Sequence, residues 1–425
     1  MVGKASLIIV VGFGFILGYI SLNLNRLATN AVGNMSSYVD ATASHNIAVT
    51  GANVGLAKFY GDTTWFGTMT QTLNPPHKGS FTVGVTDLGG DVVRLRSVST
   101  YVLPAPVNET LRDTVEVYFN KRRRNSFSMF AWMTQFEGNV FWITGDTVWG
   151  RMHSNGMLHV NGSPVFYQKV TTAKSFDPKP GVGLNKAIFK KGYETGVASI
   201  NFPDDLSELI SASASGGKKY NTDIWLTFNP GTGANGDGIA LVRTSPSGPI
   251  IDTIYLNSSS FNGVIYTTGR ARVKGVVDGR VTVAAPNVYI DDDIQYERNP
   301  QTTTSDDILG LVAAQNVYVT DNPANNNNCV INACIFTRSG SFTAENYNTR
   351  PVSGELQILG SIVQNTRGPV GTFSGSTIKS GFSKRYRYDD RLSDPNFRPP
   401  FYPGFYVKTY AITNWWESYR VPSIP

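Results

Sequence analysis

Residues 5–24 read ASLIIVVGFGFILGYISLNL, about twenty mostly apolar residues without a charge or a proline. At about 1.5 Å per helical residue, this segment is just long enough to cross a hydrocarbon core of about 30 Å. Lys4 precedes it and Arg26 follows it. The stretch therefore predicts a membrane-spanning helix near the N-terminus.

The helical pattern does not stop at the end of the apolar segment. The first proline is Pro75, and neither a turn signal nor the cleavage site of a secretory signal peptide interrupts the chain before Tyr60. We therefore expect one continuous helix over residues 5–60, with an apolar stripe in its second half that packs against other helices. The alternative is a signal anchor followed by a helix that packs on its own domain. The residues expected to make the packing contacts are Leu24, Leu27, Val32, Met35, Val39 and Ile47.

Small residues recur at regular intervals near the end of this helix, at Ala48, Gly51, Ala52 and Gly55. Together with the apolar segment, they resemble the N-terminal helix of type IV pilin-like proteins, especially the PilX-like minor pilins. The resemblance covers about sixty residues. It implies a stalk helix through which the chain assembles with other pilin-like subunits into a homo- or hetero-polymer.

The same resemblance implies how the chain is processed and where it is found. Cleavage of a pilin leader would fall after Gly3 and leave Lys4 as the first residue. The glutamate that the family has at the fifth position is replaced here by Ile8. The protein would be inserted in the inner membrane before assembly and would then reach the cell surface in an extracellular filament.

Composition indicates large folded domains. Of the 425 residues, 41% are hydrophobic and only 16% are charged, which excludes a disordered chain and predicts two or three domains. The net charge of +6 is modest for this length, and part of it lies in Lys121, Arg122, Arg123 and Arg124. We interpret that cluster as a solvated or membrane-proximal patch and expect no nucleic-acid partner.

Residues 81–119 alternate apolar and polar side chains at period two, with turn residues at Asp87–Gly90 and around Pro104 and Pro106. They predict a small antiparallel sheet at the end of the helix. We place the helix at 1–62 and the small β domain at 63–125, with the boundary near 121–126.

From Gly138 onward, very short apolar segments are separated by Gly, Asn and Asp residues. Short strands that cannot bury an inward face alone are typical of a stacked solenoid, so we predict a right-handed parallel β-helix over 126–176 and 263–425. A β-sandwich is the alternative. The fold class is thus mainly β with a long N-terminal helix.

Residues 177–262 interrupt this pattern of short strands and predict an inserted α+β subdomain. Its helix would begin near Asp204 or Asp205, bury Leu206, Leu209 and Ile210, and end at Gly216–Gly217.

The C-terminal part contains the segments RGPVGTF (from Arg367), GFSKRYRYDDRL (from Gly381) and RPPFYPGF (from Arg398). They resemble β-helical domains of PilX-like and other bacterial surface proteins, which implies a structural surface domain. Its proline-rich tail is expected to cap the last rung, and Lys384, Tyr386 and Tyr388 to form a strand edge. The residues that carry this resemblance are Arg367, Gly368, Val370, Gly371, Lys384, Tyr386, Tyr388, Asp389 and Arg391.

Cys329 and Cys334 are separated by four residues, and in an exported chain this spacing favours a disulfide. The histidines, His45, His77, His153 and His159, do not lie at metal-ligand spacing with the thiols. His153 and His159 could face each other on neighbouring strands, but we interpret them as structural.

An enzyme of the polysaccharide-cleaving kind would need converging carboxylates, and the acidic candidates are Asp291, Asp292, Asp293, Asp306 and Asp307. On a strand only Asp291 and Asp293 share a face. We interpret the aspartates as turn-capping residues, with a Ca²⁺ site at Asp291 and Asp293 as the second choice, and expect no other cofactor. No hydrolase, metalloprotease or nucleotide-binding motif is present in the sequence.

These observations predict a non-enzymatic, pilin-like structural subunit of a cell-surface filament, with an adhesive role left open. A surface glycan or protein ligand is expected, but the sequence does not indicate which. Two alternatives stay open: a membrane-anchored adhesin that never polymerises, and a β-helical enzyme acting on polysaccharides.

Overall fold

The computed structural model describes residues 2–74, 78–103, 105, 107–231, 238–374 and 377–418. His77, Pro104 and Pro106 lie outside these residues. The chain divides into two compact units: residues 1–123 with 407–425 form the first, and residues 124–406 form the second.

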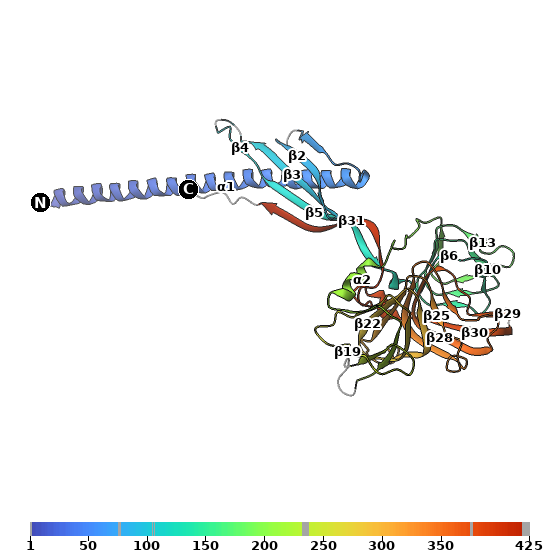
Figure 1. The fold of residues 1–425 in the computed structure, drawn as a ribbon. Helices are drawn as coiled ribbons and strands as arrows, with labels where there is room; N and C mark the ends of the chain where they lie inside the picture. The colour runs from blue at the N-terminus through green and yellow to red at the C-terminus, as the bar shows by residue number, and fades with distance from the viewer. Residues whose placement is uncertain are drawn as a thin grey trace. The chain divides into compact units, whose positions relative to one another are not determined.

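The first unit contains the long helix α1 (Val2–Gly61), which confirms the continuous helix expected over 5–60 (Figure 1). No proline interrupts it, and Lys58 in its last turn is favourably placed near the negative end of the helix dipole. Within this unit only the second half of α1 lies along the sheet, and the first half extends beyond it (Figure 1).

The sheet of the first unit has the order β1-β2-β3-β5-β31, with β4 beside β3. The pairs β1–β2, β2–β3 and β3–β5 are antiparallel, as the period-two pattern predicts. Its strands are β1 (Thr68–Thr72), β2 (Ser80–Gly89), β3 (Val92–Val102), β4 (Thr110–Leu111), β5 (Thr114–Ser126) and β31 (Gly404–Ser418). Strand β31 differs from the prediction, because it returns the chain from the second unit to this sheet instead of continuing the β-helix.

The second unit is a parallel β-helix, so the alternative of a β-sandwich is wrong. Its first face is a continuous sheet in the order β16-β20-β22-β24-β26-β28-β6-β9-β12-β15, and each of these pairs is parallel. Strands of this sheet are β6 (Trp132–Phe136), β9 (Met152–Ser154), β12 (Val170–Thr172), β15 (Tyr193–Thr195), β16 (Lys218–Tyr220), β20 (Val264–Thr267), β22 (Arg280–Ala285), β24 (Ile308–Ala313), β26 (Cys329–Thr337) and β28 (Val352–Thr366).

Two further faces complete each turn of the β-helix. The second face contains β17, β21, β23, β25 and β27, and a separate parallel sheet of β7, β10 and β13. In the third face, the later part of β23 pairs with the earlier part of β26, which pairs with the earlier part of β28, which pairs with β30. This face also contains the parallel strands β8, β11 and β14. The bounds are β7 (Trp142–Ile143), β8 (Thr147–Val148), β10 (Leu158–Asn161), β11 (Val165–Phe166), β13 (Phe176–Asp177), β14 (Ile188–Phe189), β17 (Ile224–Asn229), β21 (Ala271–Val277), β23 (Val288–Tyr296), β25 (Val317–Val319), β27 (Phe342–Ala344), β29 (Gly371–Ser374) and β30 (Thr377–Tyr388).

The order of the rungs is not the order of the sequence. The chain enters in the middle of the stack at β6, builds outward to β15, and then crosses to β16 at the opposite end. From β16 it builds back until β28 pairs with β6, where Ile362 lies opposite Trp132. The β-helix is therefore closed by contacts between segments more than two hundred residues apart.

The crossing segment, residues 196–217, replaces the predicted inserted subdomain. It contains α2 (Ser207–Ala214), where the helix was expected, and Asp205 accepts a hydrogen bond from the amide of Ser207 at 2.9 Å. Leu206 and Leu209 are buried on the outer side of the first face, in a second apolar cluster that includes Phe336 and Phe405. Strands β13 to β17 belong to the rungs, and among the described strands of residues 177–262 only β18 (Ile239–Arg243) and β19 (Asp252–Tyr255) form an antiparallel excursion.

The proline-rich segment also differs from the prediction. It does not cap a last rung but lies against β22 and β24, where the hydroxyl of Thr282 donates to the carbonyl of Pro400 at 2.6 Å. Nor is β30 an exposed edge, because it pairs with β28 and buries Tyr388. Two 3₁₀ turns, Phe127–Met129 and Asp390–Ser393, flank the entry and exit of this unit.

Candidate functional sites on the helix and the β-helix

The first half of α1 leaves its apolar side chains open. At about 100° per residue, the predicted packing residues up to Val39 share one arc of the helix surface. The side chains of Leu24, Leu27, Val32, Met35 and Val39 are 54–71% exposed. The segment from Leu7 onward is also long and apolar enough to cross a membrane, with a mean hydropathy of 2.2 over its best stretch and none of that stretch buried. Gly3 and Lys4 lie at the start of this helix.

Ile47 does not belong to this open surface, although the sequence grouped it there. It is only 6% exposed because α1 lies on its own sheet from about Ser44 onward, and Ala48, Ala52 and Phe59 are fully buried beside it. Glycine permits this close approach: a Cβ atom at Gly51 would lie 2.3 Å from the Oγ of Ser97. The small residues that carry the pilin-like resemblance thus hold the helix on its sheet.

A polar cluster marks the point where α1 passes from exposed to buried. His45 contacts Asp113 through Nδ1 at 2.8 Å and Glu417 through Nε2 at 3.2 Å. Next to it, the hydroxyls of Ser44 and Ser99 are hydrogen-bonded at 2.8 Å. Because Glu417 lies on β31, this cluster links the helix to the strand that arrives from the other unit.

The predicted Ca²⁺ site at Asp291 and Asp293 is not formed. The guanidinium of Arg272 donates two hydrogen bonds to Asp291, at 2.7 and 2.8 Å, and Asp293 accepts one from the amide of Val330 at 2.8 Å. Both aspartates lie within β23, near a register shift, and bind neighbouring strands instead of capping a turn. In the described part of the chain, no group of three or more His, Cys, Asp or Glu side chains is placed to hold a metal.

The predicted disulfide is also wrong, because Cys329 and Cys334 are both free thiols. They lie in β26 on opposite sides of the wall: Cys329 faces the core of the β-helix, and Cys334 faces the outer apolar cluster. The extended chain between them rises about 3.3 Å per residue, which separates the Cα atoms beyond the roughly 7 Å that a disulfide tolerates. Burial raises the pKa of the Cys329 thiol to about 12 and raises that of Cys334 as well.

His153 and His159 do not meet. The ring of His153 is hydrogen-bonded to Thr171 and Asn155, both at 2.8 Å, and burial lowers its pKa. His159 lies on the next strand, β10, with Asp177 at 3.2 Å.

Arg367, one of the C-terminal residues singled out above, lies in the core at the junction of β28 and β6. Its guanidinium pairs with Glu137 at 2.9 Å and lies 4.1 Å from the ring centre of Trp142, and both charged side chains are almost fully buried. Lys384 lies near Asp146 at 3.5 Å, and burial lowers its pKa. These residues close the stack where its two halves meet, which is a structural role.

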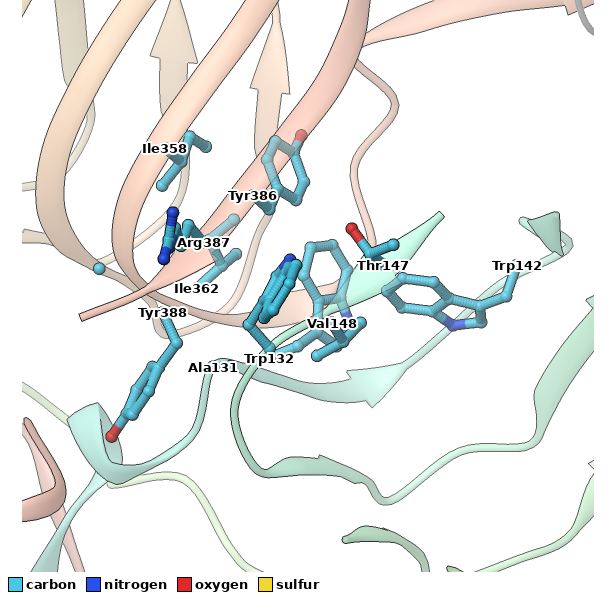
Figure 2. Close-up of a pocket in the computed structure, with 12 residues that line it drawn as sticks. Ala131, Trp132, Trp142, Thr147, Val148, Ile358, Ile362, Tyr386, Arg387 and Tyr388 are labelled. Atoms are coloured by element: carbon cyan, nitrogen blue, oxygen red, sulfur yellow. The ribbon is translucent and has the colours of Figure 1, made fainter. Parts of the chain in front are cut away.

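A small apolar recess opens at this junction (Figure 2). Trp132 stacks on Tyr386 with ring centres 6.0 Å apart and meets Trp142 edge to face at 5.2 Å. Thr147 and Arg387 lie at its border, as Figure 2 shows.

The recess continues into an open groove of about 410 Å³ on the third face. Its lining combines amides, arginines and aromatic residues, and neither an aspartate nor a glutamate is among the lining residues described. The polar and aromatic lining residues are Thr147, Trp149, Gln295, Tyr296, Asn299, Gln301, Asn332, Gln357, Arg385, Tyr386 and Arg387. The sequence did not indicate this groove, because only the pairing of strands from distant segments brings these residues together.

In the first unit, a long N-terminal helix that is apolar at its start packs its second half on an antiparallel sheet, which agrees with the stalk helix that the resemblance to type IV pilin-like proteins implies. No protein-family model and no curated protein matches the sequence. Among solved structures, the chain is similar to the competence-associated pilin ComZ from Thermus thermophilus, with 11% identity and a TM-score of 0.37, over 90% of this chain and 98% of that chain. The more specific resemblance to PilX-like minor pilins stays a prediction.

Proposed function

We propose that this protein is a structural subunit that assembles with other pilin-like subunits through the first half of α1. The observation that carries the proposal is the length of the open apolar surface. Leu7 and Val39 are both largely exposed, and the helix between them measures about 50 Å at 1.5 Å per residue.

A membrane alone does not cover a surface of this length. The hydrocarbon core is about 30 Å thick, so a membrane that covers residues 5–24 leaves Leu27, Met35 and Val39 outside it. Full burial of each such side chain stabilises by about 1.5–3 kcal/mol. Helices of neighbouring subunits would cover these residues and the membrane segment together once the subunit leaves the bilayer.

This proposal includes a route and a location. The subunit would be inserted in the inner membrane by α1, lose the residues up to Gly3, and enter a homo- or hetero-polymeric filament at the cell surface. The apolar segment near the N-terminus supports membrane insertion. A non-polymerising anchored adhesin is the second candidate, since it would have the same segment. We do not propose a glycoside hydrolase, because hydrolysis of a glycosidic bond generally uses a pair of carboxylates, and the groove lining described above contains none.

The test is a pair of matched double variants in the full-length chain, expressed in its native cell. Leu27→Asp with Met35→Asp places two carboxylates in the open arc. Thr29→Asp with Ser37→Asp adds the same charge, at the same spacing, at exposed positions on the opposite side of the helix. The first variant should abolish recovery of the protein in the sheared filament fraction, and the second should retain it.

Both variants should keep the thermal unfolding midpoint of the wild-type protein, because none of the four side chains is buried in the unit. Normal assembly of the Leu27→Asp, Met35→Asp variant would refute the proposal. Mass spectrometry of the N-terminus separates the two candidates: an N-methylated Lys4 indicates the pilin route, and an intact Met1 indicates the anchored adhesin.

A further inference from the structure

We propose that the groove on the third face of the β-helix binds an oligosaccharide that carries carboxylate groups. The inference goes beyond the assembly function, since every residue that carries it belongs to the second unit and none to α1.

The register of the strands arranges the groove floor in two parallel rows. Ile294, Ile331, Ile358 and Tyr386 lie opposite one another on successive rungs and point inward. Their chain neighbours therefore point outward. One row contains Gln295, Asn332, Leu359 and Arg387, and the other contains Val330, Gln357 and Arg385. The second row begins at Asp293, outside the groove lining, where the carboxylate accepts a hydrogen bond from the amide of Val330.

The rows repeat at the strand spacing of about 4.8 Å, which suits a ligand that is itself a regular polymer. Amide side chains both donate and accept hydrogen bonds, so they match sugar hydroxyls. Asn299 and Gln301, in the loop after β23, add two more amides to the lining.

The arginines give the groove its charge. Arg385 pairs with Glu355 at 3.0 Å, but both side chains are well exposed, so that pair is weak and can yield to a ligand. The guanidinium of Arg387 lies 5.6 Å from the ring centre of Trp149 and is exposed beside it. Glu355 and Asp293 border the groove, but the lining residues described include two arginines and neither an aspartate nor a glutamate. The lining therefore complements an anion, and planar guanidinium forks match carboxylates in particular.

The aromatic residues favour a glycan over single-stranded nucleic acid. Bases need an open ring face for stacking. Tyr167 stacks on Trp149 with ring centres 4.0 Å apart and planes 6° from parallel, while Arg387 approaches from the strand on the other side. The faces of Trp149 are thus in use, and its exposed edge offers an apolar contact without a stacking platform.

The experiment measures binding to the full chain in a detergent without a sugar headgroup, by titration calorimetry. The probes are an oligosaccharide of glucuronic acid (cellouronic acid), the matching neutral cello-oligosaccharide, dextran sulfate and oligo(dT). The variant is Arg385→Gln with Arg387→Gln. The control, Arg270→Gln with Lys274→Gln, removes the same charge at exposed positions outside the groove, and Arg270 has an ion pair like that of Arg385.

The wild type and the control should bind the cellouronic oligosaccharide equally, and the groove variant should bind at least about tenfold more weakly. Asn332→Ala with Gln357→Ala should weaken binding as well, and all variants should keep their unfolding midpoint. The proposal is overturned by equal binding of the neutral oligosaccharide or dextran sulfate, by tighter binding of oligo(dT), by an unchanged groove variant, or by no binding at all. None of these outcomes depends on whether the chain assembles through α1.

Discussion

The two halves of α1 form one continuous helix, but their apolar side chains have opposite environments. The second half places its apolar and small residues on a sheet of its own unit, and Ala48, Ala52 and Phe59 are fully buried there. The first half has a similar apolar stripe and leaves it open. The helical pattern alone therefore does not show which surface buries an apolar stripe. The two halves differ in whether the same chain supplies that surface.

The largest change in the free energy of unfolding is expected when a buried aromatic side chain in the second half of α1 is truncated. Phe59 is fully buried, and its ring lies 4.9 Å from that of Phe119 and 5.2 Å from that of Tyr410. Phe59→Ala should lower the free energy of unfolding by about 3–5 kcal/mol. The matched change in the open half, Tyr38→Ala, should alter it by less than about 0.5 kcal/mol. Denaturant titration of the detergent-solubilised chain measures both, and equal losses would contradict the division of the helix.

Replacing a glycine by alanine should change the free energy of unfolding by a smaller amount, with opposite signs in the two halves of α1. A Cβ atom at Gly51 would lie within 3 Å of Phe81 and Ser97, whereas one at Gly33 would meet nothing within 4 Å. Gly51→Ala should destabilise the first unit by about 1–3 kcal/mol through overpacking. Gly33→Ala should be neutral or should stabilise by up to about 1 kcal/mol, because alanine favours the helix. Thermal unfolding followed by circular dichroism distinguishes the two signs.

Thiol labelling sharpens the comparison further. At pH 8, Met35→Cys should react readily in the dispersed protein, while Ala52→Cys should be protected in the folded unit. Cys329 serves as the internal reference, since a pKa of about 12 leaves only about one part in ten thousand as thiolate at that pH. In assembled filaments, Met35→Cys should become protected. Continued reactivity there would show that neighbouring helices do not cover the open half.

The smallest effect is expected at the boundary between the halves. Glu417 contacts His45 from an exposed position on β31. Glu417→Gln should therefore lower the free energy of unfolding by no more than about 1 kcal/mol, because exposed ion pairs contribute little. A larger loss in denaturant titration would mean that this contact, and not the apolar packing after Ser44, holds the helix on the sheet.

The sequence alone predicted the elements whose signals are local. The helix from Val2 to Gly61 follows from a long run without proline, the antiparallel strands β2, β3 and β5 follow from period-two alternation, and α2 follows from its flanking aspartates and glycines. The β-helix was also predicted, because short apolar strands separated by small turn residues form a recognisable sequence pattern.

Only the tertiary structure decided which segments meet. Short parallel strands carry no local signal for their partners, so the sequence could not indicate that β6 joins β28 or that β31 returns to the first unit. For the same reason it misassigned Cys329 and Cys334, whose strand turns them to opposite sides of one wall. The groove depends on this register as well: Asn332, Gln357 and Arg385 are distant in sequence and become neighbours only when the rungs stack. Local pattern determined the elements of this protein, and long-range pairing determined its surfaces.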